Sequence, residues 1–183
     1  MDKARTIKFK NVIVELRPSK IAKDGVGVFA VTKIKKGMRV FEGVHLKYFN
    51  DLAPWTIYNH LPKSTQHKIM SFCVGTPDGF IPPDNYDFNS LSIEWYLNHS
   101  CDGNIGFDSV GDFIAIKTIN PGDELAYDYG LVESNPKFRM RCNCKASNCR
   151  KNITGNDWQI LKNDTQKSIF MHPYLKNKKY DYR

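Results

Sequence analysis

Long apolar runs are missing from this 183-residue chain. No stretch approaches the roughly 18 consecutive apolar residues that a bilayer-spanning helix needs. The first residues, MDKARTIKFKNVIVEL, alternate charged and apolar side chains and lack the apolar core of a signal peptide. We therefore expect an intracellular protein, cytoplasmic or nuclear, with no membrane partner. Secretion by a signal-independent route stays open.

Basic residues are almost absent between residues 78 and 133. This segment holds eleven acidic residues and one base, Lys117, so its formal charge is −10, whereas the whole chain carries +8. The segment would attract a basic ligand, and the basic flanks would attract an acidic polymer such as nucleic acid. A salt-dependent affinity for DNA or RNA would reveal the second contact. Solvated loops without partners are the alternative interpretation.

The sequence also lacks the regular alternation of strands and long helices. Short β-branched or alternating stretches, separated by turn residues, predict strands over 6–17, 26–34, 38–46, 112–119 and 124–130. Helical spacing is confined to 51–73, 90–97 and a segment that begins near Asn156. The prediction is a mainly β fold of several small sheets with a few short helices, and not a Rossmann-type sheet.

The odd number of cysteines, five, argues against a pure disulfide framework. Cys142, Cys144 and Cys149 form a C-x-C-x4-C pattern, whose polar intervening residues allow three thiolates to converge on one ion. Zinc prefers four ligands in a tetrahedron, so a fourth is required. Cys101, Cys73 and the histidines are candidates, and we favour Cys101 because it would join two distant segments. Such a zinc would be structural; three unrelated thiols are the alternative.

The stretch NHSCDGN, residues 98–104, gathers polar and reactive side chains between apolar runs. It could be a Cys-His nucleophile, a metal site or a backbone device that holds a ligand. A zinc-bound Cys101 could not attack a substrate, which weakens the first interpretation. Two further signals are weak alone, namely Gly25-x-Gly27 before a strand and the two tyrosines of AYDYG, which should share one strand face. A plain turn and core phenols are the alternatives.

In their order, these signals resemble SET-domain protein lysine methyltransferases that carry a post-SET zinc-binding motif, in a compact single-domain form. The resemblance rests on GVGVF, YLNHSCDGN, GDELAYDYG and C-x-C-x4-C, and it covers about residues 12–152. Gly103 departs from it, since many relatives have proline there, but glycine can make the same turn. The resemblance implies a SET fold with a knot-like crossing. Its segments would be a SET domain over 1–131 with a variable insert at 46–90, a post-SET zinc segment over 138–155 and a basic, partly helical tail over 156–183.

The resemblance also implies an activity, which is transfer of a methyl group from S-adenosylmethionine to the ε-amine of a lysine in a basic, histone-like protein. The residues that would hold this cofactor are Gly25, Val26, Gly27, Asn98 and His99. Tyr129 would be catalytic. Tyr127 would restrict the product to mono- or dimethyllysine, as tyrosine does at this position in the family. Zinc would be held by Cys101, Cys142, Cys144 and Cys149. The competing interpretation is a non-catalytic SET-like module that binds basic tails.

Overall fold

The computed structural model describes residues 11–177 and confirms a mainly β fold of several small sheets with a few short helices. Its strands are β1 (Val14–Pro18), β2 (Val26–Ala30), β3 (Arg39–Phe41), β4 (Ala53–Pro54), β5 (Gly79–Phe80), β6 (Asn98–His99), β7 (Ile105–Phe107), β8 (Phe113–Ala115), β9 (Glu124–Tyr127), β10 (Arg139–Arg141) and β11 (Asn152–Thr154). Its α-helices are α1 (Lys63–Phe72), α2 (Asp157–Lys162) and α3 (Pro173–Lys176). Its 3-10 helices are η1 (Leu46–Phe49), η2 (Trp55–His60), η3 (Asp84–Tyr86), η4 (Ile93–Tyr96), η5 (Tyr129–Leu131) and η6 (Ser168–Phe170). Within residues 11–177, every helix is too short or too polar to cross a lipid bilayer.

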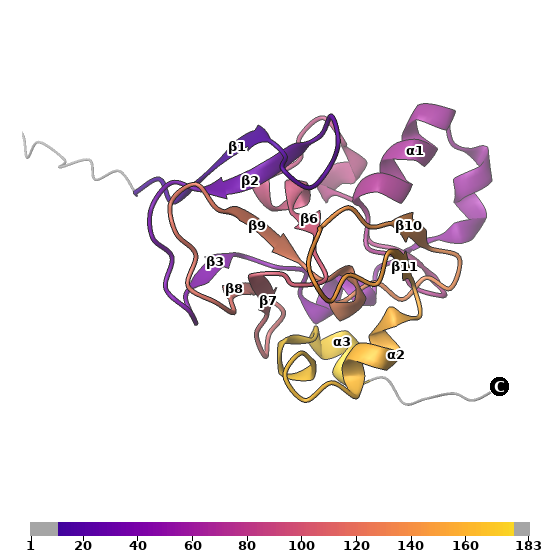
Figure 1. The fold of residues 1–183 in the computed structure, drawn as a ribbon. Helices are drawn as coiled ribbons and strands as arrows, with labels where there is room; N and C mark the ends of the chain where they lie inside the picture. The colour runs from indigo at the N-terminus through magenta and orange to yellow at the C-terminus, as the bar shows by residue number, and fades with distance from the viewer. Residues whose placement is uncertain (1–10, 178–183) are drawn as a thin grey trace, which may run out of the picture.

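The main sheet is organised around β9. It contains seven strands in the order β1-β2-β9-β7-β8-β3, and β6 also pairs with β9. Figure 1 shows β9 near the middle of the molecule, between the β1–β2 hairpin and the β3, β7 and β8 strands. Strands β6 and β7 run parallel to β9, whereas β2 is antiparallel to it. Three segments far apart in the sequence therefore meet along one four-residue strand.

A tight turn places the start of β9. The sequence Asn120-Pro121-Gly122-Asp123 closes with a hydrogen bond from the Asp123 N–H to the Asn120 carbonyl, at 3.1 Å. Gly122 has φ +85°, a conformation that glycine adopts without strain, and proline before it is typical of a type II turn. The carboxylate of Asp123 accepts the Asn120 N–H at 2.9 Å, which braces the turn from the other side.

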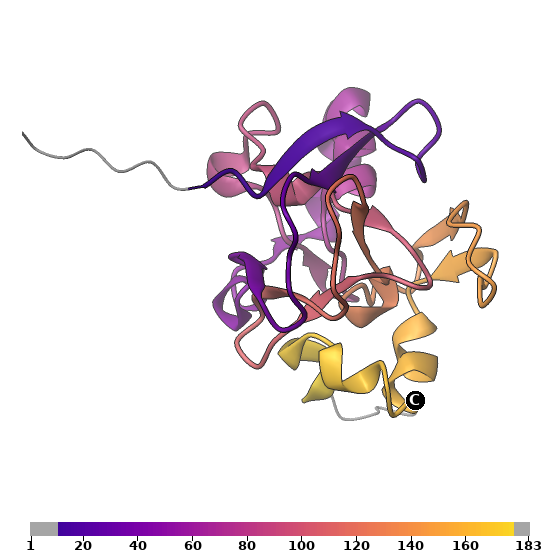
Figure 2. The ribbon, with the colours of Figure 1, turned by 60° about the vertical axis from the view of Figure 1, so that its left-hand side comes forward.

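The main hydrophobic core lies between the sheet and the C-terminal helices. Leu161, Met171 and Leu175 are each at most 3% exposed and belong to the same buried cluster as Val28, Ile105 and Leu125 of the sheet. Figure 2 shows α2 and α3, in yellow, packed beneath the strands. The expected helix after Asn156 is present, and residues 157–177 form part of the main core. Residues 178–183 of the expected basic tail lie outside the described residues.

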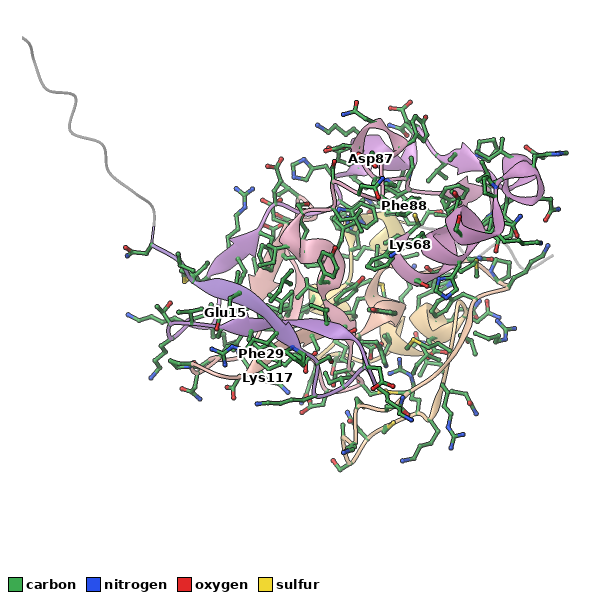
Figure 3. All side chains as sticks on the ribbon, turned by 90° about the horizontal axis from the view of Figure 1, so that it is seen from above. Glu15, Phe29, Lys68, Asp87, Phe88 and Lys117 are labelled. Carbon is green, nitrogen blue, oxygen red and sulfur yellow. The ribbon has the colours of Figure 1, made fainter. Side chains whose placement is uncertain are left out.

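Residues 46–90, expected to be a variable insert and called the insert from here on, have a small core of their own, formed by Ala53, Ile69 and Phe80. The indole N–H of Trp55 donates to the Thr76 carbonyl at 2.8 Å and closes this unit. Seen from above, Asp87, Phe88 and Lys68 lie together on the insert, away from Glu15 and Phe29 of the β1–β2 hairpin (Figure 3). Because most elements of the insert are two to six residues long, they carry little periodicity in the sequence.

The strand predictions hold in position but overstate length. The expected strands over 26–34 and 38–46 contain β2 and β3, which have five and three residues. The expected strand over 6–17 overlaps β1, although its residues 6–10 lie outside the described part of the chain. The other strands have no counterpart among the predictions, namely β4, β5, β6, β7, β10 and β11. They are two or three residues long, so pairing with neighbours, and not local propensity, defines them.

Candidate functional site

The stretch 97–101 lies at the centre of the candidate site. Pairing of β6 with β9 sets Asn98 beside Ala126 and His99 beside Tyr127. The side chain of Asn104 holds this junction, since its amide donates to the Glu124 carbonyl and its oxygen accepts the Ala126 N–H, both at 2.9 Å. The Asn104 side chain thus fixes the backbone of NHSCDGN against β9. The backbone in turn places the other polar side chains of this stretch in the site.

Asn98 joins the glycine turn to β9. Its side-chain nitrogen lies 3.0 Å from the Val26 carbonyl, 2.9 Å from Glu124 Oε1 and 3.1 Å from Ser19 Oγ. A Cβ at Gly27 would come within 2.3 Å of Glu124 Oε1, so glycine allows this close approach. The two segments predicted to hold the cofactor, 25–27 and 98–99, therefore lie in direct contact.

His99 is buried and touches both the tyrosine segment and a cysteine. Its Nδ1 accepts the Tyr129 N–H at 3.1 Å, and its Nε2 lies 3.4 Å from Cys101 Sγ. Since Nδ1 is an acceptor, Nε2 carries the hydrogen and donates it to sulfur. Burial lowers the pKa of His99 to about 4, so the imidazole is neutral at physiological pH.

The two tyrosines approach each other in a way that differs from the prediction. A shared strand face for Tyr127 and Tyr129 is wrong, because β9 ends at Tyr127 and Tyr129 begins η5. The carboxylate of Asp128 accepts the Gly130 N–H and caps η5, which ends the strand. The two rings nevertheless lie 4.9 Å apart between centroids. The Tyr129 hydroxyl donates to the Leu97 carbonyl at 3.1 Å, which leaves its oxygen free to accept a hydrogen bond.

Both tyrosines line a cavity of about 440 Å³ between the insert, the sheet and β10. Asn98 also lines it, whereas Gly25, Val26, Gly27 and His99 are not among its lining residues. Its charged lining residues are four acids and one base, namely Glu42, Asp84, Glu94, Glu133 and Arg139. Burial raises the pKa of both phenols above the usual value, so they are neutral. Among residues 11–177, no hydrogen-bond partner is found for the Tyr127 hydroxyl, which suits it to a water or a substrate amine.

Four cysteine sulfurs converge behind the cavity. The Sγ atoms of Cys101, Cys142, Cys144 and Cys149 all lie within 4.8 Å of one another, and those of Cys101 and Cys142 are 4.0 Å apart. A tetrahedral zinc with Zn–S bonds of about 2.3 Å would space its sulfurs by about 3.8 Å. The fifth cysteine, Cys73, lies in the insert and lines the cavity.

Backbone N–H groups point at this cysteine cluster. Those of Cys144, Arg150 and Lys151 each lie 3.4 Å from a sulfur. Such donors stabilise thiolates, the form in which cysteine binds a metal. The β10–β11 hairpin supplies the frame, since its pairing of Met140 with Ile153 brackets the cysteine loop. The donor set and its spacing fit a closed zinc site.

An ion network fixes the cluster to the core. Arg150 bonds both oxygens of Asp128, at 2.7 and 2.6 Å, and Asp157 at 2.8 Å. Lys167 bonds the Cys101 carbonyl at 2.7 Å. Burial would raise the pKa of Asp128, but its ion pair with Arg150 prevails and keeps that pKa below the usual value. The residue that caps η5 is thus also the anchor of the cysteine segment.

Sequence reasoning missed several residues of the cavity. Glu133, Phe138 and Met140 line it, as do Asp84, from the segment 46–90 whose fold was not predicted in detail, and Trp95, from the predicted helix over 90–97. The acidic count drew attention to the segment that contains Glu133, but no spacing singled that residue out. Its place depends on how the insert folds back onto the chain after η5.

The chain belongs to the SET-domain family, since the family model of the SET domain matches residues 25–130. It is 27% identical over 147 residues to a histone-lysine N-methyltransferase, H3 lysine-4 specific, of Cryptococcus neoformans var. neoformans serotype D, covering 74% of this chain and 9% of the relative. It is 38% identical over 72 residues to the histone-lysine N-methyltransferase Set2 of Drosophila melanogaster, covering 35% of this chain and 3% of the relative. The chain thus spans less than a tenth of these relatives.

Solved structures share the fold. The crystal structure of KRYPTONITE in complex with mCHG DNA and SAH is 22% identical, with a TM-score of 0.50, and the match covers 76% of this chain and 28% of that chain. This likeness extends the agreement beyond the residues that the family model matches, and it supports the SET fold as such.

Proposed function

We propose that this protein is an S-adenosylmethionine-dependent protein-lysine N-methyltransferase. The observation that carries the proposal is the convergence of Tyr127, Tyr129 and Asn98 on one acid-lined cavity in a SET-family chain. The matched relatives are named as histone-lysine N-methyltransferases, which favours the same reaction here. A hydroxyl held by the Leu97 carbonyl beside this cavity favours the catalytic interpretation over a module that only binds basic tails.

The charge of the cavity favours a cationic substrate. Three of its four acids, Asp84, Glu94 and Glu133, come from the acidic segment, and Glu42 follows β3. Arg139 is the one base among its lining residues. A lysine side chain with basic neighbours would be attracted and oriented by these carboxylates. A histone-like tail fits this description. The basic flanks could add contacts with nucleic acid near such a tail.

The proposed cofactor site combines the glycine turn with Asn98 and His99. Gly27 admits no side chain because Glu124 and Asn98 fill the space where its Cβ would be, so the glycine keeps these two side chains packed against the turn. When bound, S-adenosylmethionine would supply a methyl group on a positively charged sulfonium. Zinc would be held by Cys101, Cys142, Cys144 and Cys149 and would fix the segment that carries Phe138 and Arg139 against the cavity.

The residues of the chain would act by alignment and desolvation. A lysine amine has a pKa near about 10.4 and must be neutral to react, and a narrow cavity with a positive cofactor nearby favours its neutral form. The Tyr129 hydroxyl, held by the Leu97 carbonyl, would accept a hydrogen bond from the amine and orient it. Tyr127 would hold a water that crowds a larger amine, which limits the product to mono- or dimethyllysine.

Methyl transfer to mixed histones from radiolabelled S-adenosylmethionine tests the proposal. We expect label in lysine with the wild type and at least about a 100-fold loss with Tyr129→Phe, because the oriented hydroxyl is removed from the reacting centre. The matched control is Tyr86→Phe, at a tyrosine that is 73% exposed and outside the cavity, and it should keep full activity. If the wild type binds histone tails but labels none of them, the non-catalytic module is the correct interpretation.

A further inference from the structure

Glu133 is a buried carboxyl in the wall of the candidate active site. It follows η5 by two residues, is 5% exposed and lines the same cavity as Tyr127 and Tyr129. The mechanism described above does not use it. A carboxyl in such a place normally carries a counter-ion, because an isolated buried charge is costly.

Glu133 differs from the other buried carboxylates in having no cationic partner. Within residues 11–177 there are four buried acids. Asp128 and Asp157 pair with Arg150, and Asp112 pairs with Arg39. Among the described residues, Glu133 forms no ion pair and accepts only backbone hydrogen bonds, from Gly75 to Oε2 and from Asn135 to Oε1, each at 2.7 Å.

The titratable groups that face Glu133 offer no positive charge. They are the thiol of Cys73 and the phenols of Tyr127 and Tyr129, all neutral because burial raises their pKa values, that of Cys73 to about 12. The remaining charged groups of the cavity are Glu42, Asp84, Glu94 and Arg139. Each carboxylate oxygen of Glu133 still has a lone pair for a further donor. The described residues that face Glu133 therefore supply no counter-ion to its carboxylate.

We infer that Glu133 binds the ε-ammonium of the substrate lysine and accepts its proton. The inference rests on the proposed lysine methyltransferase activity. In this step one N–H bond of the ammonium breaks and an O–H bond forms at a Glu133 carboxylate oxygen, which leaves a neutral amine and a neutral carboxyl. After the methylated product leaves, the carboxyl returns its proton to water.

The acidity of Glu133 matches this role. Burial raises its pKa to about 7, even though backbone N–H groups act in the opposite direction. A proton acceptor works best when its pKa lies near the working pH, because it is then largely ionised and still basic. Near neutral pH the carboxylate is available, and it is a stronger base than an exposed glutamate.

A purely structural role for Glu133 is the competing explanation. Its bond to Gly75 and the bond from the Ser134 N–H to the Gly75 carbonyl, at 2.9 Å, fasten the insert to the segment after η5. Asp112 offers a matched control, since it is also buried, accepts the Gly43 N–H at 3.0 Å and is not part of the cavity lining. Loss of either carboxylate should weaken the fold, but only Glu133 should change proton transfer.

The first experiment compares the pH dependence of kcat/KM for the lysine peptide, at saturating cofactor, in the wild type, Glu133→Gln and Asp112→Asn. For the wild type we expect kcat/KM to rise through an inflection near pH 7, the pKa of Glu133 before the peptide binds, and then to level off. In Glu133→Gln, kcat/KM at pH 7 should be about 100-fold lower and should still rise above pH 8, where solvent can take the proton. Asp112→Asn should keep the inflection. A Glu133→Gln enzyme with the wild-type inflection and a rate within threefold would overturn the inference.

The second experiment needs no variant, so it decides the matter even if Glu133→Gln fails to fold. The Glu133 carboxyl carbon is titrated by NMR in wild-type protein with S-adenosylhomocysteine, which cannot donate a methyl group. Adding the lysine peptide should lower the Glu133 inflection by at least one pH unit, and the same peptide with methionine in place of lysine should not. An unmoved inflection overturns the inference. Absence of methyl transfer by the wild type would instead refute the proposed activity.

Discussion

The two sides of the stretch 97–101 are built in different ways. On one side, the cysteine cluster brings four sulfurs within 4.8 Å, with backbone N–H groups aimed at them and an arginine-centred ion network behind. On the other side, the cavity is walled by neutral phenols, carboxyls and one base. In the cluster, a bound metal and the backbone N–H groups would balance the charge of the thiolates. In the cavity, the carboxylate of Glu133 has no ion-pair partner among the described residues. The cluster is suited to fixing a shape and the cavity to binding a cation.

His99 connects the two sides. Its ring contacts Cys101 through Nε2 and the Tyr129 backbone through Nδ1. Because Nε2 donates to sulfur, the ring orientation that supports Tyr129 depends on where Cys101 is held. Disturbing the cluster should therefore reach the tyrosine, whereas changes in the cavity should leave the cluster intact. The predictions below test this asymmetry.

Loss of the cluster should have the largest effect. We expect one tightly bound zinc per chain in the wild type and almost none in Cys142→Ser, since three ligands bind zinc far more weakly than four. Hydrogen exchange should then accelerate across 138–155 and at 128–131, while β7 and β8 stay protected. Metal analysis and hydrogen–deuterium exchange mass spectrometry measure both effects.

The matched control for this test is Cys73→Ser. Cys73 lies in the insert, outside the group of four sulfurs, so zinc content should be unchanged. If Cys142→Ser kept its zinc and its slow exchange, the cluster would not be the element that fixes the shape.

The cluster and the tyrosines could be predicted from the sequence because their spacing carries chemistry. The C-x-C-x4-C spacing is typical of metal sites, and NHSC together with AYDYG is typical of one protein family. The position of Tyr129 outside β9 could not be predicted. The strand ends because the Asp128 side chain caps η5, and a single side-chain contact leaves no periodic signal in the sequence. Glu133 could not be predicted either, because its place depends on the Gly75 loop of the insert. Short 3-10 helices, such as those in the insert, leave little trace in hydrophobic periodicity.

A change confined to the cavity should alter the product and not the fold. Tyr127→Phe removes a hydroxyl with no bond to the described protein residues, so stability should change by less than about 1 kcal/mol. We expect the wild type to give mainly mono- and dimethyllysine, and the variant to accumulate trimethyllysine because the crowding water is lost. Mass spectrometry of a peptide at several times measures this distribution. Abundant trimethyllysine from the wild type would contradict the role given to Tyr127, and zinc content should stay at one per chain in both proteins.

A pH-dependent difference in stability is also expected at Glu133. Its pKa is raised from 4.5 to about 7 in the folded protein, so the stabilisation from its protonated form is present below about pH 4.5 and is lost as the pH rises through 7. Glu133→Gln abolishes this loss. Between pH 5.5 and 8 the wild type should thus lose about 2 kcal/mol relative to the variant, or about 4–8 °C in Tm.

Thermal unfolding of the two proteins across this pH range, with zinc present, measures that difference directly. His99 and His172, whose pKa values burial lowers to about 4, act with the opposite sign: their stabilisation is present above about pH 6.5 and is lost as the pH falls. Both proteins share these histidines, so their contribution cancels in the comparison. A pH-independent difference between Glu133→Gln and the wild type would mean that the cavity wall is as well solvated as the surface, and the contrast between a charge-matched cluster and an unmatched cavity would fail at this residue.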